Sequence, residues 1–137
     1  MLYNFTGGSD GGTPNGGMAR DSLGNLYGTT FAGGAYDYGV VFKLTPTGTE
    51  SVLHSFESTL TNASPDGGYP TSNLTRDSSG NLYGTTEIGG AFSADCKDFI
   101  ESTCGTVFEV SASGAESLLY SFKGPPSMGR TPPLGVF

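Results

Sequence analysis

The chain has 137 residues, the size of one ordinary domain, and more than a fifth of them are Gly (23) or Pro (8). Charged residues are 14% and aromatic residues 12%, with no Trp, which excludes a disordered segment and a helical bundle. The net charge is −7 and the six basic residues are scattered, which argues against nucleic acid or anionic membranes as partners.

Each half of the chain predicts the same four short strands. We expect the second strand at residues 26–30 and 82–86, and the third at residues 40–44 and 106–110. The first strand is expected near residues 18–20 and 74–76, and the fourth at residues 51–56 and 117–122. Turn residues separate them, with Asp at the start and Gly near the end of residues 21–25 and 77–81.

The third strand is the most apolar. Val40, Val41 and Phe42 follow one another without alternation, which predicts burial on both faces of the strand. A four-stranded antiparallel sheet that is covered on both faces is typical of a β-propeller blade. The sequence therefore predicts an all-β, propeller-like fold of tandem four-stranded blades.

The two halves are copies of one repeat. Residues 10–35 match residues 66–91 at 17 of 26 positions, and residues 39–56 match residues 105–122 at 9 of 18. The spacing between the copies grows from 56 to 66 residues, because the second copy carries an insertion within residues 92–104.

The repeat divides the chain into about two full blades with partial ones at each end. We expect the end of a preceding unit at residues 1–9, unit 1 at 10–65, unit 2 at 66–124 and the start of a third unit at 125–137. Propellers close with roughly 4–8 blades. We therefore expect a fragment of a larger propeller, whose exposed blade edges favour self-association.

Five motifs recur in both copies: Gly-Asn-Leu-Tyr-Gly-Thr-Thr, Gly-Gly-Ala, Gly-(Thr/Val)-Val-Phe, Leu-(Tyr/His)-Ser-Phe and Asp-Gly-Gly-x-Pro. Over nearly the whole chain they resemble the bacterial GloVer tandem repeat of the "choice-of-anchor" GloVer-containing proteins. The resemblance implies an extracellular or surface-displayed bacterial array. It implies no established activity and no catalytic residue.

Residues that recur in every unit are interpreted as structural, because a catalytic residue is normally unique in its chain. We interpret Asp21 and Asp77 as turn caps, and Tyr27 and Tyr83 as residues that pack between strands. We interpret Asp10 and Asp66 as turn residues, with a repeated ligand or cation site as the alternative. His54 replaces Tyr3 and Tyr120, which predicts a half-buried strand residue. We expect no catalytic residue, no metal site and no cofactor.

Long, variable loops leave one face of the predicted blades, whereas the turns on the opposite face are tight. Ligand binding usually resides on such loops over a rigid scaffold. The loops carry aromatic and acidic residues that suit a carbohydrate or protein ligand, and ordinary solvated loops are the alternative. The candidate residues are Tyr36, Asp37, Tyr38, Phe92, Asp95, Lys97, Asp98, Phe99 and Glu101.

Cys96 and Cys104 are the only cysteines. Their spacing, with no nearby His, does not match a zinc site. We expect a local disulfide, which implies an oxidising compartment, with two free thiols as the alternative. No apolar run approaches the roughly 20 residues of a membrane span, and no signal peptide is visible in this chain.

These observations favour a non-enzymatic, extracytoplasmic segment that acts in surface display, adhesion or ligand binding. One alternative is a propeller enzyme, of hydrolase or lyase type, with a metal or an acid pair in the central channel. The other alternative is a structural spacer. The fold alone does not separate them.

Overall fold

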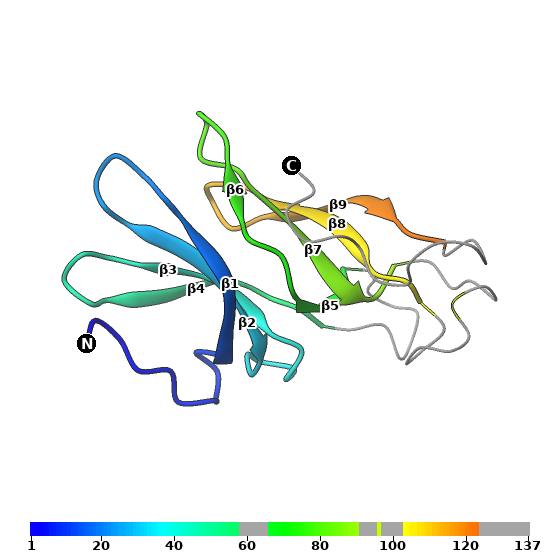
Figure 1. The fold of residues 1–137 in the computed structure, drawn as a ribbon, viewed down its shortest axis with the longest axis horizontal. Coiled ribbons are helices and arrows are strands. Elements are labelled where there is room, and N and C mark those ends of the chain that lie inside the picture. Colours follow the sequence, from blue (N-terminus) through cyan, green and yellow to red (C-terminus); the bar gives the residue numbers. More distant parts are fainter. Residues whose placement is uncertain (58–65, 91–95, 97–102, 124–137) are drawn as a thin grey trace.

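The computed structural model describes residues 1–57, 66–90, 96 and 103–123. These residues form an all-β structure of two antiparallel sheets (Figure 1). Within the same residues, no helix is long and apolar enough to cross a membrane. The strands are β1 (Gly12–Arg20), β2 (Leu26–Ala32), β3 (Val40–Leu44), β4 (Glu50–Ser55), β5 (Gly68–Pro70), β6 (Thr75–Arg76), β7 (Leu82–Ile88), β8 (Thr106–Val110) and β9 (Glu116–Ser121).

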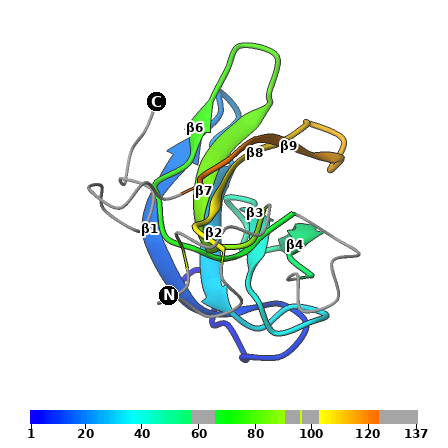
Figure 2. The same ribbon diagram turned by 90° about the vertical axis from the view of Figure 1, so that its right-hand side faces the viewer.

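The two sheets have the same topology, one for each copy of the repeat. The first has the order β1-β2-β3-β4, and the second has the order β5-β7-β8-β9 with β6 also paired to β7. β5 and β6 together occupy the place of β1, because Pro70 pairs with Thr86 as Pro14 pairs with Thr30. The sheets pack against each other and do not close into a barrel (Figure 2). The propeller-like, all-β prediction is confirmed.

The first strand of each sheet begins earlier than expected. The sequence placed it near residues 18–20 and 74–76, but β1 starts at Gly12 and β5 at Gly68. Thr13 and Tyr69 in these segments have positive φ angles of 54° and 53°. These strands pair on one side only, and an edge strand tolerates the proline and the irregular backbone that hide the pattern in the sequence.

The hairpin turns close as their sequence predicts. Asp21 accepts hydrogen bonds from the backbone N–H of Leu23 and Asn25, from the Asn25 side chain and from the Tyr27 hydroxyl. Asp77 makes the same four contacts in the second sheet. The hydrogen bond from the Asn25 side chain is the main reason that the pKa of Asp21 falls to about 2. The two aspartates are turn caps.

The main core lies between the two sheets. Val41 and Phe56 from the first sheet pack against Leu82, Phe108 and Val110 from the second. The opposite face of β3 packs against the N-terminal segment, where the rings of Phe42 and Phe5 lie 4.8 Å apart. β3 is therefore covered on both faces, as its uninterrupted apolar sequence predicted.

The Gly of the Leu-Tyr-Gly-Thr-Thr motif makes room for this core. Gly84 pairs with Phe108 across the sheet, and the Phe108 ring lies over the space where a side chain would be. A Cβ atom at position 84 would lie 2.7 Å from Phe108 Cζ and 3.0 Å from Leu74 Cδ2. Gly28 and Phe42 repeat this arrangement in the first sheet.

Replacing Gly84 with Ala is therefore expected to lower the free energy of unfolding by about 1–3 kcal/mol through overpacking. Urea denaturation measures the loss. Gly8→Ala is the control, because its Cβ would meet only the Thr6 hydroxyl at 3.4 Å. Adding Phe108→Leu to Gly84→Ala should cost less than the sum of the two single changes. Strict additivity would contradict the contact.

Cys96 and Cys104 form a disulfide bond, with their Cα atoms 5.5 Å apart. Both residues are buried. The expected pairing is thus confirmed, and the alternative of two free thiols is wrong. The bond closes the base of the insertion that distinguishes the second copy of the repeat from the first.

Candidate functional site

The two ends of the sheets differ. The tight turns at residues 21–25, 45–49, 77–81 and 111–115 lie at one end, which we call the hairpin end. The β2–β3 loop, the end of β4 and the start of β5 lie at the other, the long-loop end (Figure 1). The candidate ligand residues that the structure describes come from this end.

The structure describes three of those candidates, all in the β2–β3 loop. Tyr36 is 51% exposed, and a hydrogen bond to Glu57 raises the pKa of its hydroxyl. Asp37 accepts a hydrogen bond from the Gly33 backbone N–H at 2.9 Å and so holds its own loop closed. Tyr38 is half-buried and packs against the main core. Tyr36 and Asp37 are thus the exposed side chains among the three.

Three aromatic rings gather at this end, where the two sheets meet. The rings of Phe31 and Tyr69 stack with centroids 4.7 Å apart, and Tyr38 lies 5.3 Å from Tyr69 in a tilted arrangement. The Tyr69 backbone N–H also donates to the Tyr38 carbonyl at 2.8 Å. Phe31, Tyr38 and Tyr69, which we call the aromatic cluster, join the two sheets and are each partly exposed.

Sequence reasoning missed Phe31 and Tyr69, although a signal was present. The two copies align Phe31 with Glu87 and Tyr69 with Thr13, so neither ring recurs in the other copy. The six other candidates lie outside the described residues: Phe92, Asp95, Lys97, Asp98, Phe99 and Glu101.

At two junctions between units, an aspartate is bound to a ring from the end of the preceding unit. His54 Nε2 lies 2.9 Å from Asp66 Oδ2, and Asp66 also accepts from the Glu57 backbone N–H. Tyr3 donates its hydroxyl to Asp10 at 2.9 Å in the same manner. His54 is half-buried in β4, as predicted. Both aspartates lie in turns, and at each Asp-Gly-Gly motif the carboxylate contacts a ring that precedes it in the chain.

A carboxyl group with an unusual environment faces each of these contacts. Burial raises the pKa of Glu116 to about 7; the nearby Asp66 raises it further and His54 opposes the shift. Burial and Asp10 raise the pKa of Glu50 in the equivalent place. The Oε1 atoms of both glutamates are buried without a hydrogen-bond partner. The folded protein therefore holds the protonated form of Glu116 more readily than the unfolded chain does.

This raised pKa predicts how stability depends on pH. Since folded Glu116 binds a proton that the unfolded chain releases above its ordinary pKa of 4.5, stability should fall as pH rises from 4.5 to about 7. Glu116→Gln should remove the loss of stability that comes from ionising Glu116. The variant should therefore melt roughly 3–6 °C higher than the wild type at pH 8, but not at pH 4. His54 and Asp66 are unchanged in the variant, so the difference isolates Glu116. Equal melting temperatures at pH 8 would contradict the prediction.

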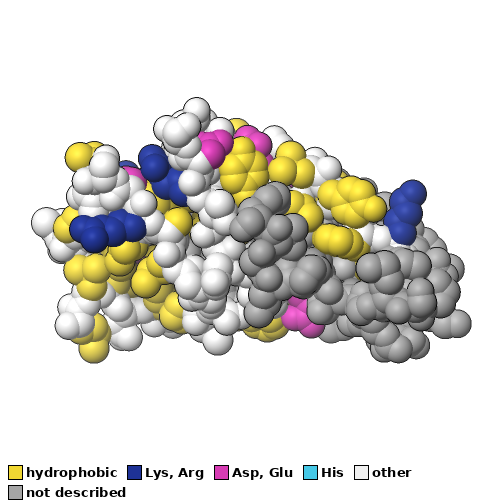
Figure 3. Space-filling model, turned by 45° about the horizontal axis from the view of Figure 1, so that its top comes forward, with side chains coloured by type: hydrophobic (Ala, Val, Ile, Leu, Met, Phe, Trp, Pro, Cys, Tyr) yellow, Lys and Arg dark blue, Asp and Glu magenta, His cyan; other side chains and the backbone are white. Residues whose placement is uncertain are grey.

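The outer surface of the second sheet is apolar. Hydrophobic side chains are exposed over this sheet in Figure 3. Leu119 and Tyr120 in β9 are 48% and 57% exposed. They correspond to Leu53 and His54 of β4, which in the first sheet face the second sheet. The surface that the second sheet covers on β4 is thus exposed at the equivalent positions of β9.

No group of three or more His, Cys, Asp or Glu side chains that could hold a metal ion occurs among the described residues. A comparison with curated proteins found no match. The model of the Gloeobacter/Verrucomicrobia repeat family matches residues 1–136. This match agrees with the resemblance to the GloVer repeat that the repeated motifs carry. The chain belongs to the Gloeobacter/Verrucomicrobia repeat family.

Proposed function

We propose that this repeat protein is a non-enzymatic, carbohydrate-binding segment of an extracytoplasmic bacterial array, and that its ligand binds at the long-loop end. The aromatic cluster carries this proposal. Aromatic rings offer flat apolar surface to the C–H faces of a sugar, at a low cost in side-chain entropy. Tyr36 adds an exposed ring beside Glu57.

The fold holds the rings of the aromatic cluster in place. Phe31 lies at the end of β2, and Tyr69 lies in β5 of the other sheet, so their stacking fixes the surface at the junction. Glu57 and Asp37 supply carboxylates that can accept hydrogen bonds from hydroxyl groups. A rigid aromatic surface with polar groups at its rim is the usual composition of a small-molecule site.

One observation supports the extracytoplasmic part of the proposal, and another supports the bacterial part. The disulfide between Cys96 and Cys104 is of the kind that persists in oxidising compartments. The repeat family that contains this chain is named after bacteria.

An oligosaccharide array, followed by isothermal titration with the best ligand, tests the proposal. Tyr36→Ala and Phe31→Ala should each weaken binding by about tenfold or more, as expected when a ring that stacks on the ligand is removed. Leu23→Ala is the control, because Leu23 is 79% exposed but lies at the hairpin end.

Two results would contradict the proposal. One is that the protein binds no saccharide on the array. The other is a saccharide whose affinity is the same for the wild type, Tyr36→Ala and Phe31→Ala. Circular dichroism of each variant shows that a loss of binding does not come from unfolding.

A further inference from the structure

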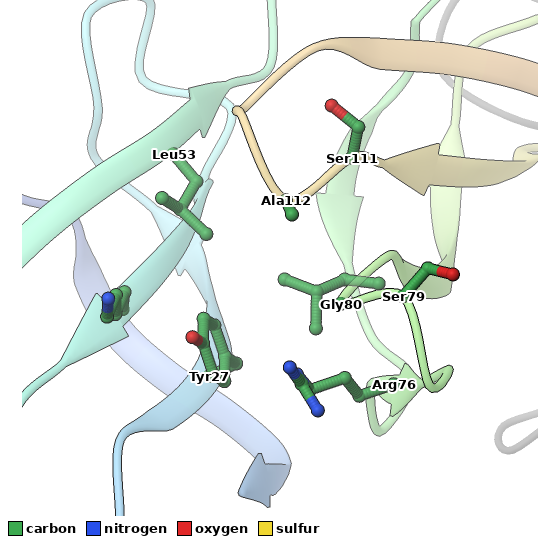
Figure 4. A pocket seen from close by; sticks show the side chains of 9 residues that line it. Tyr27, Leu53, Arg76, Ser79, Gly80, Ser111 and Ala112 are labelled. Atoms are coloured by element: carbon green, nitrogen blue, oxygen red, sulfur yellow. The ribbon is translucent and has the colours of Figure 1, made fainter. Parts of the chain in front are cut away.

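A cavity lies between the two sheets, at the hairpin end. Its volume is about 160 Å³. Tyr27 of β2, Lys43 of β3 and Leu53 of β4 form one wall, while Arg76 and the turns at residues 79–80 and 111–112 form the other (Figure 4). Tyr27 and Phe31 lie near opposite ends of β2, so this cavity is separate from the aromatic cluster.

The cavity is positively charged in a protein of net charge −7. Two of the six basic residues line it, and its lining contains no acidic side chain. Within residues 1–57, 66–90, 96 and 103–123, neither Lys43 nor Arg76 forms an ion pair. Arg76 Nε is also buried without a hydrogen-bond partner. A guanidinium that lies in a cavity with no counter-charge calls for an anion there.

The Arg76 guanidinium is held in a defined position. It lies over the ring of Tyr27, 5.9 Å from the ring centroid. The Tyr27 hydroxyl is itself fixed by its hydrogen bond to Asp21. The side chain also runs along its own hairpin, since a Cβ atom at Gly80 would lie 3.3 Å from an Arg76 terminal nitrogen. A planar donor group fixed in this way suits two-point binding of an oxyanion.

The repeat shows what is unusual about this cavity. Arg20 and Arg76 occupy the same position in the two copies, as do Tyr27 and Tyr83. Lys43, however, corresponds to Glu109. A glutamate at that position would place a carboxylate opposite the arginine. With lysine, the lining of the cavity between the two described sheets has two positive charges and no acidic side chain.

We propose that this cavity binds a small oxyanion group, a carboxylate, sulfate or phosphate, with the Arg76 guanidinium as its forked donor and Lys43 as the second charge. A cavity of about 160 Å³ has room for one such group. An acidic sugar, a sulfated sugar or a free inorganic anion could each supply it.

Isothermal titration with sodium glucuronate, sodium sulfate and sodium phosphate tests the proposal, with NaCl keeping the ionic strength constant. We expect one anion per chain to bind and Lys43→Glu to weaken binding at least tenfold, because the glutamate takes the place of the ligand beside Arg76. Lys43→Gln and Arg76→Gln should weaken it as well. Lys123→Glu makes the same change of net charge away from the cavity and should leave the affinity unchanged. The anion that binds best distinguishes the three sources.

Melting temperatures supply an independent readout. Lys43→Glu should melt at a higher temperature than the wild type without added anion, and it should lose the anion-dependent increase. If none of the three salts binds, the proposal is wrong. If sulfate raises the melting temperature of the wild type and of Lys43→Glu equally, the effect is general salting-out, and the proposal is also wrong. Neither result bears on saccharide binding at the aromatic cluster.

Discussion

Replacing Phe56 with Ala is expected to lower the free energy of unfolding by about 3–5 kcal/mol. Phe56 follows β4 and is fully buried. Its ring packs edge-on against Phe108 of the second sheet, with centroids 5.1 Å apart, and against His54 at 4.8 Å. The truncation would leave a cavity at the junction of the sheets, so the loss measures how much the stacking of one unit on the next stabilises the chain.

Phe122 is a matched control for Phe56, because the repeat places it at the same position after β9. Both backbone N–H groups donate to the carbonyl of a glycine, Gly39 or Gly105, at 3.0 Å. The Phe122 ring is only half-buried, and its ring contact in the described part of the chain is with Tyr120. Phe122→Ala should therefore cost clearly less in urea denaturation. Equal losses for the two variants would contradict a core formed between the sheets.

Removing the disulfide is expected to have the next largest effect. The bond joins residues eight positions apart, and in the chain-entropy description closing so short a loop contributes about 2–3 kcal/mol. Cys96→Ala combined with Cys104→Ala should therefore lower the melting temperature by roughly 10 °C or more. Differential scanning calorimetry measures the shift.

Reduction of the wild-type protein is the control for this double substitution. A reducing agent should lower the melting temperature of the wild type but leave that of the double variant unchanged. If the double variant melted at the wild-type temperature, the bond would not stabilise the folded state. If the reducing agent shifted both proteins equally, its effect would not come from the disulfide.

Several features of the fold could be predicted because their causes are local. The bounds of β3 and β8 agree with the prediction, since an uninterrupted apolar run specifies a strand that is buried on both faces. The Asp21 and Asp77 caps could be predicted as well, because an aspartate at the start of a turn bonds to backbone groups only two to four residues away. The predicted starts of β1 and β5 lie several residues after the observed ones, because an irregular edge strand has no such sequence pattern.

The candidate functional residues were harder to find, because they depend on differences between the copies. Tyr36, Asp37 and Tyr38 come from a loop that the sequence singled out, yet Tyr38 is half-buried and packs against the main core. Phe31 and Tyr69 are separated by 38 residues, and Lys43 and Arg76 by 33, so no local pattern links the members of either pair. Each pair combines residues from both sheets.

The sequence by itself determined the repeat, the later strands of each sheet, the turns and the family, and it favoured the disulfide over two free thiols. All of these follow from short-range spacing or from comparison of one copy with the other. Only the tertiary structure decided which side chains meet across the junction: the stacked rings at the long-loop end, the paired cations at the hairpin end, and the contact of His54 with Asp66. The physical reason is that stacking two sheets face to face brings together residues that are far apart in the chain, and the geometry of stacking is set by the whole core.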